Sequence, residues 1–83
     1  MNKYLVIDFD RYDTNNSKRF YVEADSSWEA LSGVVKGIII GTGDSDPEYA
    51  EEELKYLKGL WEEVSDTFSC VSLEESDYLV YKI

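Results

Sequence analysis

The sequence has 83 residues, of which 18 are acidic and 8 are basic, so its net charge is −10 and its pI is about 4.2. Hydrophobic residues form 43% of it, too many for a disordered chain, and this predicts a single folded domain over residues 1–83. There is no histidine and one cysteine, Cys70, which excludes histidine-based catalysis, cysteine-rich metal sites and an internal disulfide. The acidity disfavours direct binding to nucleic acids or anionic membranes, because phosphate contacts need Lys and Arg.

The N-terminal residues do not have the basic segment and apolar stretch of a signal peptide. The longest apolar run, GIII at residues 37–40, is far shorter than the roughly 20 residues that span a bilayer. We therefore expect a cytoplasmic protein that does not associate with membranes.

Two strands are predicted at the start of the chain. Residues 3–10 (KYLVIDFD) alternate, so that Leu5, Ile7 and Phe9 share one face while Tyr4 and Val6 share the other. A polar loop at residues 11–17 separates this segment from a second alternating run at residues 18–24. Two strands joined by a short polar loop predict an antiparallel hairpin.

A helix is predicted from about residue 26, where Ser26 and Glu29 match a capping box. Gly33, Gly37 and Gly41 recur every fourth residue along one stripe of it. Each interior glycine costs about 1 kcal/mol of helix propensity relative to alanine, so the helix either continues to Gly41 or ends near Gly37. The stripe predicts that a neighbouring element approaches this helix closely.

The second helix is predicted over residues 47–64, with Asp46 as its cap and Pro47 as its first residue. Apolar residues at spacings of four and three form one stripe along it: Ala50, Leu54, Leu57, Trp61 and Val64. Residues 67–73 and 78–83 read as a second hairpin around a polar turn. The order predicts an α+β fold, ββααββ, with an antiparallel sheet of about four strands and two helices packed on one face.

The segment LVIDFDRYDT at residues 5–14 is similar to the catalytic segment of the haloacid-dehalogenase-type phosphatases, in which two aspartates act on phosphate. That family needs a parallel sheet, whose crossover connections take about a dozen residues or more, and the next strand here follows too soon. We therefore expect Asp8 and Asp10 to form the solvent-facing end of a strand. Asp8, Asp10 and Asp13 do not match the EF-hand spacing, and the alternative is a weak Ca²⁺ or Mg²⁺ site formed by their carboxylates.

No catalytic residue, metal site or cofactor is predicted, and we expect the protein not to be an enzyme. Cys70 lies within a strand pattern without a basic neighbour that would lower its pKa. We expect it to be a small core residue.

The segment at residues 44–66 holds nine acids and two lysines. Carboxylates three or four positions apart on a helix lie about 5–6 Å from one another, which is close to the phosphate spacing of a nucleic acid. The candidate partner-binding residues on this acidic helix are Glu48, Glu51, Glu52, Glu62 and Glu63. The alternative is an ordinary solvated helix with Glu51 and Lys55 as an ion pair.

A second candidate surface is the sheet face opposite the helices. The alternation is interpreted as placing Tyr4, Tyr21 and Tyr78 there, with Val6 and Val80. Tyrosine is favoured at interfaces because it combines apolar area with a polar tip. This face predicts a protein partner or a homodimer, and the alternative is cross-strand packing in a monomer.

In its small size, acidity and lack of a catalytic set, the chain with its segment PEYAEEELKYLKGLWEEV (residues 47–64) resembles the phage-encoded anti-CRISPR and anti-restriction inhibitors. Several of these imitate the charge of a nucleic acid. The resemblance implies a non-enzymatic inhibitor, in the cytoplasm of a host cell, that blocks a basic, nucleic-acid-binding protein through its acidic helix. The alternative function is a self-associating accessory or adaptor domain that binds through the tyrosine-rich sheet face.

Overall fold

The computed structural model describes residues 1–41, 47–73 and 75–83. Its elements are β1 (Asn2–Asp10), the 3-10 helix η1 (Thr14–Asn16), β2 (Lys18–Ala24), α1 (Ser27–Gly41), α2 (Pro47–Leu60), β3 (Glu62–Glu63), β4 (Phe68–Ser72) and β5 (Ser76–Lys82). The predicted α+β class is confirmed. The sheet has five strands instead of about four, because the two-residue strand β3 lies between α2 and β4.

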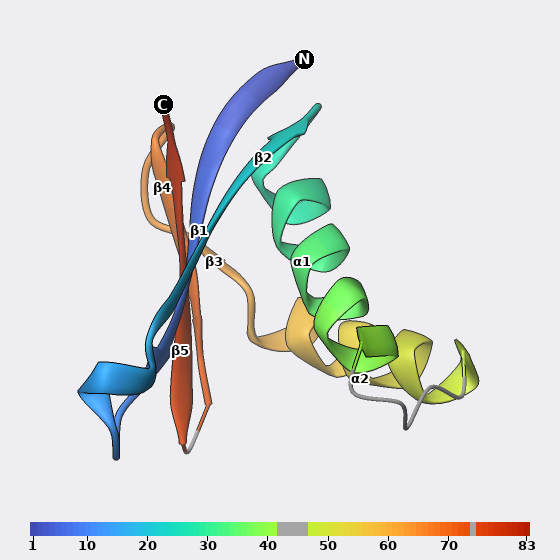
Figure 1. The fold of residues 1–83 in the computed structure, drawn as a ribbon. Helices are drawn as coiled ribbons and strands as arrows, with labels where there is room; N and C mark the ends of the chain where they lie inside the picture. Colours follow the sequence, from blue (N-terminus) through green and yellow to red (C-terminus); the bar gives the residue numbers. More distant parts are fainter. Residues whose placement is uncertain (42–46, 74) are drawn as a thin grey trace.

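The sheet has the strand order β2-β1-β5-β4-β3, and each neighbouring pair is antiparallel. Both predicted hairpins are present, β1 with β2 and β4 with β5. Strands β1 and β5 also pair, which brings the two ends of the chain together in the sheet. Figure 1 shows α1 and α2 on the same side of it. The described strands therefore lack the parallel arrangement that the phosphatase family requires.

Helix α1 begins at the predicted cap, Ser26, with a variant of the capping box. The backbone N–H of Glu29 donates to Oγ of Ser26 at 3.2 Å, and Oε2 of Glu29 accepts from the N–H of Asp25, one residue before the cap, at 3.2 Å. The helix continues past Gly37 to Gly41. Gly33 and Gly37 are exposed, and a Cβ built at either would meet no atom within 4 Å. The predicted close approach at these two positions is therefore wrong.

Helix α2 begins at Pro47 as predicted, whereas the predicted cap Asp46 lies outside the described residues. It ends at Leu60 and not at residue 64. The residues that follow leave the helix because Glu62 and Glu63 pair with β4, so backbone groups there bond to the sheet instead. Trp61 packs its ring against Trp28 of α1, with centroids 5.4 Å apart and planes at 70°. Nζ of Lys58 lies 4.7 Å from the centroid of the Trp28 ring.

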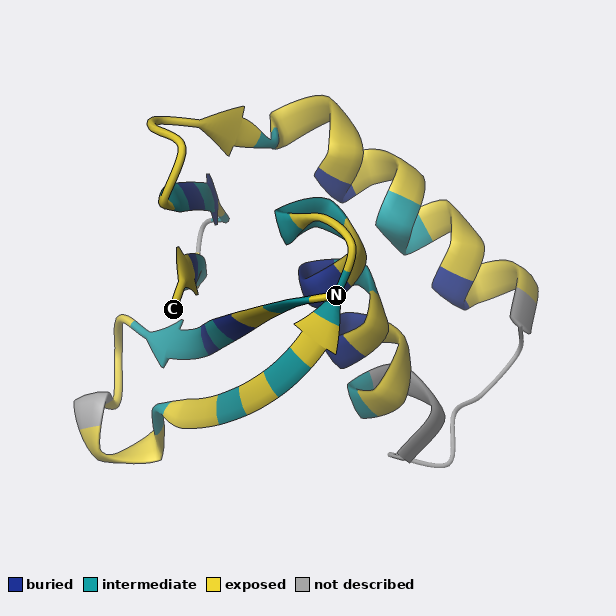
Figure 2. Cartoon of the chain, turned by 90° about the horizontal axis from the view of Figure 1, so that it is seen from above, coloured by how far each residue is buried: buried dark blue, intermediate teal, exposed yellow. Residues whose placement is uncertain are grey.

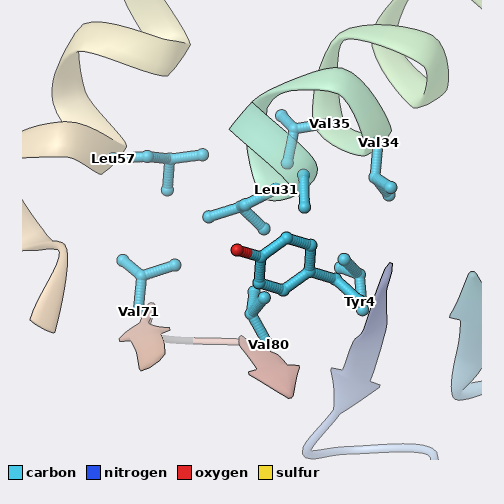
Figure 3. Packing of buried hydrophobic residues seen from close by; sticks show 9 residues of the cluster. Tyr4, Leu31, Val34, Val35, Leu57, Val71 and Val80 are labelled. Carbon is cyan, nitrogen blue, oxygen red and sulfur yellow. The ribbon is translucent and has the colours of Figure 1, made fainter. Parts of the chain in front are cut away.

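The core lies between the sheet and the two helices (Figure 3). Tyr4, Val71 and Val80 rise from the sheet toward Leu31 of α1 and Leu57 of α2. Figure 2 shows the buried positions of α2 along the side that faces the rest of the molecule, with exposed positions outward. Burying these side chains away from water is the main force that holds the helices to the sheet.

In β1 and β5 the helices cover the opposite face from the predicted one, whereas in β2 Tyr21 lies on the uncovered face as predicted. Tyr4 and Val80 are 4% and 1% exposed beneath the helices, and Val6 is buried with them. Tyr78 is half-buried against the same cluster. The first half of β1 is apolar on both faces, so periodicity identifies two faces but does not say which one is covered.

Candidate interaction surface

The sheet face turned away from both helices is apolar, and we call it the open face. Alternation along each strand and the register between strands place these apolar side chains on it: Leu5, Ile7, Phe9, Tyr21, Phe68, Cys70, Leu79 and Tyr81. Within the described ranges, no helix or strand lies over this face (Figure 1). Contiguous apolar surface of this kind is typical of interaction sites.

Two cross-strand rows form the middle of the open face. The first, which we call the central row, runs across all five strands in the order Arg19, Ile7, Leu79, Cys70 and Glu62. The second, which we call the aromatic row, consists of Tyr21, Leu5, Tyr81 and Phe68. Both rows are apolar in their interior, and only the central row has a charge at each end.

The aromatic row contains two exposed large apolar side chains of the open face. The side chains of Tyr21 and Tyr81 are 74% and 39% exposed. The rings of Phe68 and Tyr81 lie with their centroids 4.8 Å apart and their planes at 32°. Paired aromatic rings on a rigid sheet have little conformational entropy to lose on binding, which suits them to a protein interface.

The open face is electrically balanced although the chain is strongly acidic. Among the described residues, its charged side chains are three cations and three anions: Lys3, Arg11, Arg19, Glu23, Glu62 and Asp77. The acidic side chains of α2 lie on the other side of the sheet. A partner can approach the open face without meeting the main concentration of negative charge.

One ion pair, between Arg11 and Asp77, lies at one end of the open face. Nη2 of Arg11 donates to Oδ1 of Asp77 at 2.6 Å, and Nε of Arg11 donates to Oδ2 at 3.0 Å. This two-point contact lowers the pKa of Asp77 and raises that of Arg11, chiefly through the hydrogen bonds between them. The pair ties the residue after β1 to the start of β5.

Cys70 lies on the open face and is half-buried, so the prediction that it is a core residue is wrong. Burial raises the pKa of its thiol, and the negative charges of Glu62 and Asp77 raise it further. The thiol is therefore protonated at neutral pH, and this environment does not activate a nucleophile.

The three predicted tyrosines do not share one surface. Tyr21 is on the open face as predicted, while Tyr4 and Tyr78 lie on the helix-covered face. Sequence reasoning missed Leu5, Leu79 and the rest of the open face. The missed signal was the unbroken apolar run YLVI in β1, a pattern that indicates a strand buried on both faces.

The five predicted acidic residues are split between two elements. Glu48, Glu51 and Glu52 are exposed on α2, where they surround a shallow depression together with Lys55. Glu62 and Glu63 belong to β3 and point to opposite faces of the sheet. The prediction of one acidic stripe along a single helix is therefore wrong at these last two positions.

The aspartates near the end of β1 serve the local structure. Oδ1 of Asp10 accepts hydrogen bonds from the backbone N–H groups of Tyr12 and Asp13 at 2.9 and 3.2 Å, and Asp13 caps η1. Asp8 is half-buried on the helix-covered face, and burial raises its pKa, against the lowering effect of Lys18. The prediction that Asp8 lies at the solvent-facing end of a strand is therefore wrong. The described residues contain no group of three or more His, Cys, Asp or Glu that could hold a metal ion.

A polar recess of about 510 Å³ lies on the helix side, between the start of α1 and the β3–β4 connection. Oγ of Ser27 and Oγ of the buried Ser69 lie 3.4 Å apart in it. Acidic and basic side chains at its margin include Asp25, Glu63 and Lys82. The hydrogen bond between these two hydroxyl groups does not involve a carboxylate, so it does not by itself form the nucleophile-base pair of a catalytic site.

Comparisons with protein families, with characterised proteins and with solved structures find no match for this chain. Among the described helices, none is both long enough and apolar enough to cross a bilayer.

Proposed function

We propose that this chain is a non-enzymatic protein-interaction domain that works as an accessory or adaptor through its open face. The observation that carries the proposal is the uncovered apolar face of the five-stranded sheet, with Tyr21 and Tyr81 exposed in its aromatic row. Apolar surface that leaves water stabilises a complex by about 25 cal/mol per Å². A rigid sheet adds little ordering cost, so this face is well suited to binding.

The test is capture of binding partners by the immobilised chain, with one variant on each side of the molecule. The open-face variant carries Tyr21→Glu and Tyr81→Glu. The matched control carries Tyr49→Glu and Tyr56→Glu, which have the same change in charge at tyrosines that are 53% and 59% exposed on α2. We expect the open-face variant to lose the bound protein and the control to retain it.

Circular dichroism melting of each variant checks that binding is not lost through unfolding. A partner retained by the folded open-face variant would contradict the proposal. A partner lost by both variants equally would also contradict it, since the effect would then follow total charge and not the face.

A second candidate function is inhibition of a basic, nucleic-acid-binding protein, the activity that the resemblance to anti-CRISPR proteins implies. It is favoured by the exposed carboxylates of Glu48, Glu51 and Glu52 on α2 and by the net charge of −10 of the chain. Charged surfaces of this kind steer oppositely charged partners and increase association rates.

Charge reversal on α2 tests this second function. Glu51→Lys with Glu52→Lys is expected to weaken binding at least about tenfold, and binding by the native chain should weaken steeply with salt. Glu63→Lys, on β3, is the control at a site off the helix. Binding that survives the α2 reversal would exclude mimicry of nucleic-acid charge by this helix.

A further inference from the structure

We propose that the open face binds a second copy of this chain, in a two-fold dimer with the two sheets face to face and the helices outward. This inference rests on the proposed function of the open face and names its occupant. It is carried by the central row, which has a cation at one edge of the sheet and an anion at the other.

The charges of the central row cannot pair within one chain. Arg19 lies on the outer strand β2 and Glu62 on the opposite outer strand β3. Four strand spacings of about 4.8 Å separate them by roughly 19 Å. Both side chains are exposed, and within the described part of the chain neither forms an ion pair.

A two-fold axis parallel to β5 makes the row complementary to itself. β5 is the middle strand of the five, so this rotation places it over its own copy and exchanges β1 with β4 and β2 with β3. Arg19 then faces Glu62 of the second copy, and Ile7 faces Cys70 of the second copy. Leu79 meets its own copy at the centre. Two opposite-charge contacts form, one at each edge.

The aromatic row follows the same rotation. Leu5 faces Phe68 of the second copy, and Tyr81 meets its own copy beside the axis. Packed sheets cross at about 30° and lie about 10 Å apart. This angle displaces an edge strand by about 5 Å from exact alignment, a distance that an arginine side chain can span.

The distribution of charge also favours a second copy over an unrelated acidic or basic partner. The open face is balanced, so two such faces do not repel each other on contact. The helices lie on the far side of each sheet, and the acidic residues of α2 are therefore directed away from the interface (Figure 1). An isologous dimer needs one patch that is complementary to itself, and the central row is such a patch.

The dimensions of the face set the expected strength. Five strands and about six residues of each long strand cover roughly 19 by 20 Å before side-chain corrugation is counted. Stable dimers bury about 800 Å² of accessible surface per partner, and the flat area of this face is only about half of that, so the face is small for a stable dimer. We expect an equilibrium between monomer and dimer with a dissociation constant on the order of micromolar.

Sedimentation velocity of the purified chain over a wide concentration range tests the inference. We expect the mass to rise toward twice the 9.6 kDa of one chain. Arg19→Glu and Glu62→Arg should each weaken the dimer about tenfold or more, because both edge contacts become like-charge contacts. The double variant, Arg19→Glu with Glu62→Arg, should restore the dissociation constant to within about threefold, since the contacts re-form with reversed polarity.

Two controls separate the interface from the fold. Glu63→Arg makes the same charge change on the same strand but on the other face of the sheet, and should leave the dimer unchanged. Alkylation of Cys70 by iodoacetamide should slow as the native chain is concentrated, because Ile7 of the second copy covers it. In Arg19→Glu that protection should be lost at the same concentration.

A chain that stays monomeric at every concentration would overturn this inference, as would a dimer that is indifferent to both single charge reversals. These failures are distinct from failure of the proposed function. Suppose that the chain is monomeric, that it captures another protein, and that the open-face variant does not. That result overturns only the proposal that the open face binds a second copy. A monomer with no binding through the open face overturns both.

Discussion

The structure of α1 does not require glycine at positions 33 and 37. Both are exposed, and added Cβ atoms would contact nothing. Replacing each with alanine removes the conformational freedom of glycine in the unfolded chain without a clash in the folded one. We expect Gly33→Ala and Gly37→Ala each to increase the free energy of unfolding by about 0.5–1 kcal/mol, measured by urea denaturation.

Ala30→Gly provides the opposite control in the same helix, because Ala30 is buried in the core and a glycine there should destabilise the protein. A decrease in stability in Gly33→Ala or Gly37→Ala would mean that an atom contacts that side of α1 after all.

Tyr78 provides a second prediction for a single residue. Burial, followed by the negative charges of Asp8 and Glu53, raises the pKa of its hydroxyl to about 12. Because the folded-state pKa is above the ordinary value of about 10, the neutral phenol stabilises the fold below that pH. This contribution is lost as the pH rises through about 12. Ultraviolet absorbance titration should show a late phase that is absent in Tyr78→Phe, and an unchanged late phase would contradict the assignment.

At the scale of elements, the Arg11–Asp77 pair connects the residue after β1 to β5 and should influence acid stability. The hydrogen bonds from Arg11 lower the pKa of Asp77, so the pair stabilises the fold above the ordinary carboxyl pKa and this effect is lost as the pH falls through the lowered value. We expect Asp77→Asn to lower the melting temperature at neutral pH and to reduce its dependence on pH at acidic pH. If the melting temperatures of the native chain and of Asp77→Asn change with pH in the same way, this prediction is wrong.

Helix α2 is held less extensively than the central strands, because its main contacts are with α1 and the short strand β4, whereas β1 and β5 each pair with two neighbouring strands. Its buried anchors are Ala50 and Leu57. We expect amide hydrogens of α2 to exchange faster than those of β1 and β5. Leu57→Ala should destabilise the protein by about 2–5 kcal/mol and accelerate exchange in α2 most. Uniform exchange across the helix and the central strands would show that α2 does not open separately.

At the scale of the whole molecule, ten excess negative charges repel one another in the folded state. Salt screens this repulsion over about 10 Å at 0.1 M. We expect the melting temperature to rise when salt is added at low ionic strength, at a protein concentration low enough to keep the chain monomeric. A melting temperature that falls with salt would mean that favourable ion pairs outweigh the repulsion.

Much of the local structure can be predicted because short-range chemistry decides it. The Ser26–Glu29 capping box starts α1, and Pro47 starts α2. The end of α2 cannot be predicted in the same way. The apolar spacing continues to Trp61 and Val64, but Glu62 and Glu63 pair with β4, so their backbone groups bond to the sheet and not within a helix. That pairing depends on residues far along the chain.

Local patterns in the sequence are sufficient to predict the α+β class, the two hairpins, the starts of both helices and the overall negative charge. These follow from alternation, capping and composition, which act between near neighbours. The packing of the whole chain determines which face of the sheet the helices cover, because Leu5 and Val6 are both apolar and either face of β1 suits a core. It also determines that Arg19 and Glu62 end one row, since register across five strands depends on every pairing at once.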